Sequence, residues 1–161
     1  MKILNIVGTR PNFIKIAPII EQMDQSAKIS YALIHTGQHH DENMNQTFFN
    51  QLNIPSPDVN LGVRGGSNIQ QVSQILQKFE PVLLRERPHA VLVVGDVNST
   101  LACAMVAAYH GIKVVHVEAG LRSFDLSMPE EINRILTDKI SDLLFVTEAS
   151  GMKNLAREGI D

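Results

Sequence analysis

The sequence is poor in several residue types that mark particular classes of protein. Its 161 residues include no tryptophan and a single cysteine, Cys103. One thiol cannot form an internal disulfide, so the sequence gives no sign of an oxidising compartment. Cys103 lies in the apolar segment 101–105. That setting favours a buried structural thiol over a nucleophile.

Long apolar segments are missing as well. No stretch is long enough to span a membrane. Residues 1–20 lack the layout of a signal peptide, because Arg10 and Lys15 interrupt their apolar character. We therefore expect a cytoplasmic protein that does not engage a membrane.

Neither sign of charge is in large excess. The formal net charge is −3, which argues against nucleic-acid binding, since a general nucleic-acid binder carries a basic patch. A small ligand that bears phosphate is compatible with this charge, because one or two well-placed cations can hold it.

The residues that are present alternate between short β-branched runs and helical spacing. The strand-like runs are residues 3–7, 31–35, 90–94, 114–117 and 143–146. They are apolar at nearly every position, as strands buried on both faces are. Apolar residues at helical spacing lie between them, and they include Phe13, Ile16 and Ile20, then Val72, Ile75 and Phe79, then Leu101 and Met105, then Ile132, Ile135 and Leu136.

This order predicts an α/β fold. We expect one domain over residues 1–161, a Rossmann-like doubly wound parallel sheet with helices on both faces. Pro18 and Pro81 should each kink or break a helix. Residues 53–66 are rich in proline and glycine, and we expect a loop there with one short strand.

In such sheets ligands bind at the carboxyl ends of the strands. After the first predicted strand, Gly8 permits a tight turn, and Thr9 can cap the next helix with Pro11 in its first turn. The N–H groups of that helix end would attract an anion, and Arg10 and Lys15 could add positive charge. An ordinary β-to-α turn with solvated basic residues explains the same pattern.

Three histidines and an aspartate lie at the end of the second predicted strand and just after it, within residues 35–41. A metal site needs converging side chains, and adjacent His39 and His40 would point apart on a regular element. We expect a polar, ligand-facing loop without a metal.

Acidic residues follow the later strands. Asp96 fits either turn chemistry or a carboxylate aimed into a cleft, with Asn98 or Ser99 capping the next helix. Strand alternation would place Glu118 on the same face as His116. Burial there would raise the pKa of the Glu118 carboxyl and suit it to proton transfer. A structural ion pair with Arg122 is the alternative.

The next predicted helix begins with two adjacent glutamates. Ser127 and Glu130 have the spacing of a capping box, which would explain Glu130 without catalysis. Glu131 could be a first-turn carboxylate that faces the helix dipole. With the basic residues nearby, among them Arg134, these carboxylates suggest proton transfer on a phosphorylated substrate.

The motifs together resemble those of non-hydrolysing UDP-N-acetylglucosamine 2-epimerases. The matching segments are Gly8-Thr9-Arg10-Pro11, Gly95-Asp96, His116-Val117-Glu118-Ala119-Gly120-Leu121-Arg122 and Pro129-Glu130-Glu131-Ile132-Asn133-Arg134. The resemblance implies one half of a glycosyltransferase-B type arrangement, in which two Rossmann-like domains face each other across the active site. This chain corresponds to the N-terminal domain, and the C-terminal UDP-binding domain is absent from it.

The resemblance also implies a reaction and a set of residues. Members interconvert UDP-GlcNAc and UDP-ManNAc for cell-envelope polysaccharides, by elimination of UDP to a 2-acetamidoglucal and re-addition. They need no cofactor or metal and are commonly homodimers. The implied catalytic residues are Asp96, Glu118 and Glu130, the implied substrate-binding residues are Arg10, Lys15, Arg122 and Glu131, and Gln38 and His39 match a pair that binds a second UDP-GlcNAc as an allosteric activator. The short loop 123–128 leaves the choice between Glu130 and Glu131 open.

Three other functions are compatible with the same motifs. A hydrolysing epimerase would release free ManNAc and UDP, and a glycosyltransferase-B type transferase would share the fold but not the chemistry. The chain alone could be a non-catalytic nucleotide-sugar-binding module. We expect the isolated chain to be inactive, because one wall of the cleft would be absent.

Overall fold

The computed structural model describes residues 1–37 and 46–160 and contains one six-stranded sheet. The strands are β1 (Lys2–Val7), β2 (Ser30–His35), β3 (Val59–Asn60), β4 (Ala90–Val94), β5 (Lys113–Val117) and β6 (Leu143–Phe145). Their order is β3-β2-β1-β4-β5-β6 and all pairs are parallel. The predicted Rossmann-like sheet is confirmed, and each predicted strand is found within one residue of its expected ends.

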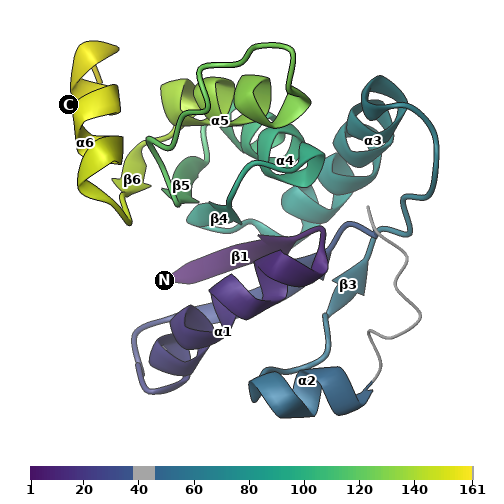
Figure 1. Cartoon of the computed structure of the whole chain (residues 1–161). Coiled ribbons are helices and arrows are strands. Elements are labelled where there is room, and N and C mark those ends of the chain that lie inside the picture. The colour runs from purple at the N-terminus through teal and green to yellow at the C-terminus, as the bar shows by residue number, and fades with distance from the viewer. Residues whose placement is uncertain (38–45, 161) are drawn as a thin grey trace.

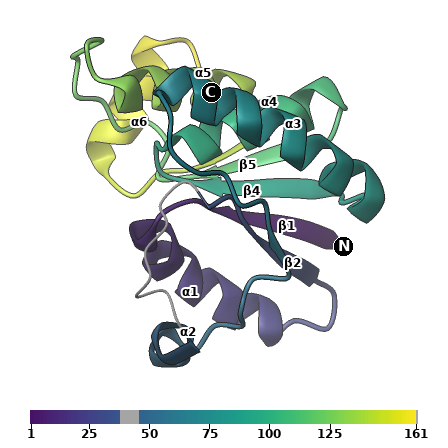
Figure 2. The same cartoon turned by 90° about the vertical axis from the view of Figure 1, so that its right-hand side faces the viewer.

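Helices cover both faces of this sheet. On one face lie α1 (Arg10–Asp24) and α2 (Gln46–Leu52); on the other lie α3 (Asn68–Glu86), α4 (Asn98–Tyr109) and α5 (Pro129–Ile140) (Figures 1 and 2). The last helix, α6 (Ala149–Arg157), follows β6 at the end of the sheet. None of the helices in the described residues is both long and apolar enough to cross a membrane.

Each face of the sheet has its own apolar core. On the α1 side, the rings of Phe13 and Phe49 meet edge to face with centroids 5.5 Å apart. On the other side, Phe79 packs in one cluster with residues of α4, including Cys103. Cys103 is fully buried, and burial raises the pKa of its thiol well above the ordinary range. The predicted role of Cys103 as a buried thiol is confirmed.

Of the two outcomes predicted for the prolines, a kink or a break, the break does not occur in either helix. Pro18 lies inside α1 and Pro81 inside α3, and both are exposed. The carbonyls that lose their helical partner belong to Ile14 and Gln77, which are also exposed. Water can solvate these carbonyls, so the missing hydrogen bonds are tolerated on the outer side of each helix.

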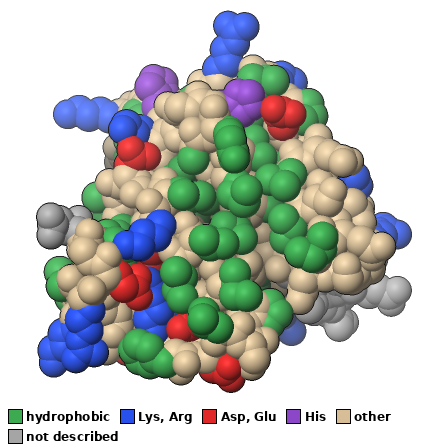
Figure 3. Space-filling view, turned by 90° about the horizontal axis from the view of Figure 1, so that it is seen from above, with side chains coloured by type: hydrophobic (Ala, Val, Ile, Leu, Met, Phe, Trp, Pro, Cys, Tyr) green, Lys and Arg blue, Asp and Glu red, His purple; other side chains and the backbone are tan. Residues whose placement is uncertain are grey.

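Helix α5 packs with its polar side inward. Its buried residues are Glu131, Asn133, Thr137 and Asp138. The apolar residues that predicted the helix point the other way, since Ile132 is 44% and Leu136 is 45% exposed. A shallow groove joins this side to α4, and it is lined by Leu101, Met105, Ala108, Tyr109, Leu136 and Ile140. Figure 3 looks onto this helix layer and shows apolar side chains gathered near its middle.

Candidate active site

The candidate site lies where β1, β4 and β5 end. These strands are neighbours in the sheet, so their carboxyl ends meet at one edge. The chain leaves β1 for one face and β4 for the other, which makes this the switch point where open α/β sheets bind ligands. Asn12 of α1 bridges the two strand ends, since its Nδ2 donates to the Val94 carbonyl at 3.1 Å.

The turn after β1 has the predicted form. Thr9 is the N-cap residue of α1, and Pro11 lies in the first turn. The Oδ1 atom of Asn12 accepts from the backbone N–H groups of Gly8 at 3.1 Å and Thr9 at 3.0 Å. Arg10 and Lys15 are both exposed at this end of the helix. The turn therefore places two cations at the edge of the sheet.

Glu118 occupies a turn and not an extension of its strand. β5 ends at Val117, and Glu118 has a φ of 69°. The left-handed region costs a non-glycine residue about 1 kcal/mol, and such strain is concentrated at functional sites. The prediction that strand alternation continues through Glu118 is therefore wrong.

The partner of Glu118 is Lys15. Their Oε2 and Nζ atoms lie 2.5 Å apart, and both side chains are partly exposed. The alternative pairing with Arg122 is not observed. A Cβ atom built on Gly95 would lie 3.4 Å from Glu118 Oε2 and 3.7 Å from Lys15 Nζ. The turn between β4 and α4 thus lies directly against this ion pair.

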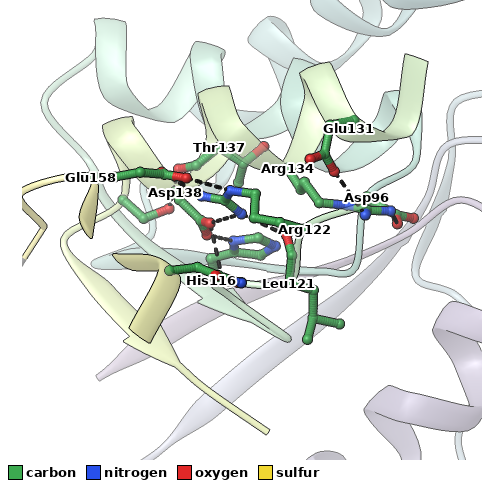
Figure 4. A network of polar contacts seen from close by, with 12 residues as sticks. Asp96, His116, Leu121, Arg122, Glu131, Arg134, Thr137, Asp138 and Glu158 are labelled. Carbon is green, nitrogen blue, oxygen red and sulfur yellow. Dashed lines mark hydrogen bonds and ion pairs between the residues drawn. The ribbon is translucent and has the colours of Figure 1, made fainter. Parts of the chain in front are cut away.

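Asp96 follows Gly95 in that turn and forms an ion pair with Arg134 of α5 (Figure 4). Its carbonyl oxygen accepts from Asn133 Nδ2 at 2.9 Å. Sequence patterns had placed Arg134 near the cleft but had not paired it with Asp96. Two successive residues of α5, Asn133 and Arg134, therefore hold the turn that contains Asp96.

The predicted cap of α4 is wrong. The N-cap position is Val97, without a side-chain hydrogen bond. The side chain of Asn98 instead donates to Asn68 and Gln71 of α3 and accepts from Asn133. Asn98 therefore joins three helices beside the Asp96 turn.

Glu131 is buried beneath the loop that precedes α5. It is 1% exposed and accepts the N–H groups of Ser123 at 2.9 Å and Phe124 at 2.8 Å. Arg134 NH1 lies 2.9 Å from its Oε2. Burial alone would raise the pKa of the Glu131 carboxyl, but these backbone hydrogen bonds and the Arg134 charge bring it below the ordinary value. Glu131 thus shapes the loop.

Glu130 is exposed in the first turn of α5. The predicted capping box with Ser127 is not formed, because the N-cap position is Met128 and Ser127 bonds to Asp125. Glu130 precedes Arg134 by one helical turn, and residues so spaced are neighbours on a helix surface. Glu130 therefore lies on the side of α5 that carries the Asp96 contact.

Arg122 is buried, in contrast to Arg10 and Lys15. Its NH2 atom lies 2.7 Å from Glu158 Oε2 and its NH1 atom 2.8 Å from Asp138 Oδ2, and its side chain is 1% exposed. Asp138 also lies 2.7 Å from the buried His116 ring. Figure 4 shows this group beside the Asp96–Arg134 pair. Arg122 holds the 120s loop between α5 and α6 in this arrangement.

Asp138 was missed by sequence reasoning. It follows Glu131 by seven residues and Arg134 by four, so the three share one face of α5. A run of charged and amide residues at that spacing, opposite an apolar face, was the available signal. The spacing does not say which face packs inward.

The structure therefore brings Glu118 and Lys15 together against Gly95, the residue before Asp96, and places Arg134 beside Asp96. The predicted allosteric pair, Gln38 and His39, lies outside the described residues. Within the described part of the chain, no group of three His, Cys, Asp or Glu residues is placed to hold a metal. At the carboxyl ends of strands, carboxylates can take and give protons, and the cations beside them can neutralise an anionic group.

Comparison with known proteins places the chain in a family. The family model for UDP-N-acetylglucosamine 2-epimerases matches residues 21–161. The chain is 50% identical over its whole length to the UDP-N-acetylglucosamine 2-epimerase of Methanocaldococcus jannaschii, of which it covers 44%. It is 48% identical to the UDP-2,3-diacetamido-2,3-dideoxy-D-glucuronate 2-epimerase of Pseudomonas aeruginosa, of which it covers 46%.

Solved structures give the same result. A structure of the M. jannaschii enzyme in complex with UDP-GlcNAc and UDP aligns with a TM-score of 0.96 over 100% of this chain and 44% of that chain. The chain thus spans less than half the length of these relatives. The family match, the identity along the whole chain and the shared fold show that this chain belongs to the UDP-N-acetylglucosamine 2-epimerase family.

Proposed function

We propose that this chain is the N-terminal catalytic domain of an epimerase that interconverts UDP-GlcNAc and UDP-ManNAc. The supporting observation is that Asp96 and Glu118 lie on adjoining turns at the carboxyl edge of the sheet, and that each is paired with a cation. Epimerisation needs groups that take and give a proton at C2 and a positive charge near the diphosphate. The edge of this sheet offers both kinds of group.

The proposed reaction is elimination followed by re-addition. The C2 proton of the sugar is not next to a carbonyl, so simple deprotonation is difficult. When the C2 proton leaves to a base, the C1–O bond to UDP breaks and a 2-acetamidoglucal forms. Protonation at C2 from the opposite face and return of UDP to C1 give the epimer. A carboxylate near C1 would stabilise the oxocarbenium-like charge in both steps.

We assign Asp96, Glu118 and Glu130 to the reacting sugar. Arg10 and Lys15 are assigned to the diphosphate, because they are exposed cations at the start of α1, where the helix dipole also favours an anion.

The two remaining predicted contacts are assigned differently. Glu131 and Arg122 are buried and bound to protein groups, so we propose that they position the loop beside the site.

A second domain is part of this proposal. The relatives are more than twice as long as this chain, and we propose that a further Rossmann-like domain closes the cleft in the glycosyltransferase-B manner and holds UDP. The isolated chain would then have negligible turnover, because one wall of its site is missing.

The P. aeruginosa relative supports a second candidate substrate. Its name gives a UDP-sugar with acetamido groups at C2 and C3 and a carboxylate at C6, and it is almost as similar as the M. jannaschii enzyme. Inversion at C2 by the same steps would apply to that sugar. Only the groups that contact C3 and C6 would have to differ.

The test is a reaction of the full-length protein with UDP-GlcNAc in D2O, followed by proton NMR, with the diacetamido-glucuronate sugar in parallel. UDP-ManNAc carrying deuterium at C2 is the expected product. If only the diacetamido-glucuronate sugar gives a deuterated epimer, that sugar is the substrate in place of UDP-GlcNAc. Free ManNAc would identify a hydrolysing enzyme, and no reaction with either sugar would favour a transferase or a binding module.

Glu118→Gln gives the matched test of the site. The amide keeps the shape of the side chain but cannot accept the proton, so turnover should fall by about 100-fold or more. Glu21→Gln makes the same change on an exposed residue of α1 and should leave turnover unchanged. Equal turnover in the two variants would remove Glu118 from the reaction.

A further inference from the structure

The ring of His116 lies between two groups that accept hydrogen bonds. It is fully buried, with Nδ1 2.7 Å from Asp138 Oδ1 and Nε2 2.8 Å from the carbonyl oxygen of Gly95. A carbonyl oxygen has no proton to donate, so Nε2 must carry one. The state of Nδ1 depends on whether Asp138 is ionised.

The other contacts of Asp138 are those of an ionised carboxylate. Its Oδ2 accepts the Gly120 N–H at 3.0 Å and lies 2.8 Å from Arg122 NH1. An ionised carboxylate can only accept, so Nδ1 of His116 must carry a proton as well.

The charges around the ring are compatible with this protonation state. The side chains of Arg122 and Asp138 are 1% and 0% exposed, and Glu158, whose side chain is 27% exposed, gives Arg122 a second anionic partner. An imidazolium at His116 therefore gives this group equal numbers of positive and negative charges.

The same ion pair holds both turns that carry candidate catalytic carboxylates. His116 holds the carbonyl of Gly95, the residue before Asp96, while the Gly95 N–H donates to Val117 at 3.0 Å. Asp138 holds the N–H of Gly120, two residues after Glu118. The His116–Asp138 contact therefore ties the position of the Asp96 turn to that of the Glu118 turn.

We propose that His116 is a doubly protonated imidazolium in the folded protein and acts as a positioning residue for Asp96 and Glu118. Without its second proton, the ring could hold only one of its two acceptors, and one turn would be released. A displacement of about 1 Å can slow a catalysed step about 100-fold. The positioning role rests on the proposed function, whereas the protonation state does not.

The protonation state is measured first, on the full-length protein labelled with 15N at histidine. At about pH 7.5 an ordinary histidine is mostly neutral and has one ring nitrogen without a proton. Both ring nitrogens of His116 should instead appear protonated in 1H–15N correlation NMR. A His116 ring with one unprotonated nitrogen would overturn the proposal. In Asp138→Asn the ring should become neutral, since an amide can donate to Nδ1.

The positioning role is measured by product partitioning in His116→Gln, whose amide cannot reproduce both hydrogen bonds. The readout is the ratio of released 2-acetamidoglucal to epimer, which does not depend on the fraction of enzyme that is folded. Displaced carboxylates should raise this ratio several-fold, and an unchanged ratio would reduce His116 to a structural residue. Absence of epimerisation in the wild type would instead overturn the proposed function and leave the NMR result standing.

Discussion

Glu130 and Glu131 are adjacent in the sequence but lie in different environments, which allows their roles to be separated. Glu131 holds the N–H groups of Ser123 and Phe124, whereas Glu130 is exposed. Glu131→Gln should lower the free energy of unfolding by about 2 kcal/mol, because hydrogen bonds to a charged acceptor are lost. Glu130→Gln should leave unfolding unchanged and lower turnover of the full-length enzyme. Urea denaturation and product NMR give the two readouts, and the reverse pattern would exchange the two assignments.

The contribution of Glu131 should also depend on pH. The pKa of its carboxyl lies below the ordinary value in the folded chain, so the unfolded chain binds the proton more tightly. The stabilisation is therefore complete above the unfolded pKa, about 4.5, and is lost as the pH falls through the folded pKa. The free energies of unfolding of the wild type and Glu131→Gln should differ above about pH 5 and converge as the pH falls through the folded pKa. A difference that stays constant over this range would show that ionisation of Glu131 does not contribute to the stability of the fold.

Among the elements, the loop after β5 meets the start of α6 at Gly120. A Cβ atom on Gly120 would lie 2.6 Å from the Gly151 carbonyl oxygen, and its φ is 79°. Gly111 has a similar φ of 67° but nothing within 4 Å of its Cβ position. Gly111→Ala should cost about 1 kcal/mol of stability for the backbone alone. Gly120→Ala should cost about 2 kcal/mol more, because the chain must shift to accommodate the methyl group.

Thermal or urea unfolding of the two variants measures this difference directly. Equal losses would mean that the 120s loop can move away from α6. In that case the anchoring of the loop by Arg122 and Asp138 would be weaker than the structure indicates.

The elements show which features could be predicted from the sequence. The positions of the strands and their parallel arrangement followed from apolar β-branched runs, because both faces of a parallel sheet are covered. The placement of Asp96, Lys15 and Glu118 at one edge of the sheet followed from their positions after the predicted strands. The conformation of Glu118 did not, because it depends on Lys15, 103 residues away, and on the buried Asp138 contact.

The inward face of helix α5 could not be predicted from the sequence. Its apolar spacing predicted a helix, but spacing cannot say which side of a helix the domain covers. The polar side faces inward here because it supplies partners to Asp96, His116 and Arg122. Sequence reasoning based on apolar periodicity therefore missed Asp138, the residue that joins these contacts.

At the scale of the whole molecule, the outward apolar side of α4 and α5 supports a homodimer, which we propose for the full-length protein. Tyr109 is 85% exposed at the end of α4, and Leu136 borders the same groove. Leu136→Glu would place a charge in that interface and should give monomers in sedimentation experiments at concentrations where the wild type dimerises. Glu21→Gln, far from the groove, is the control. A wild type that is monomeric at all concentrations would refute the proposed dimer.

The single thiol offers a built-in reporter on the whole domain. Cys103 is covered on every side by the α4 core, and its raised pKa suppresses the reactive thiolate. A thiol reagent can therefore modify it only when α4 separates from the sheet. The labelling rate under native conditions then gives the frequency and free energy of that opening. Because the chain has one cysteine, ligand-induced tightening of the domain could be followed without introducing any probe.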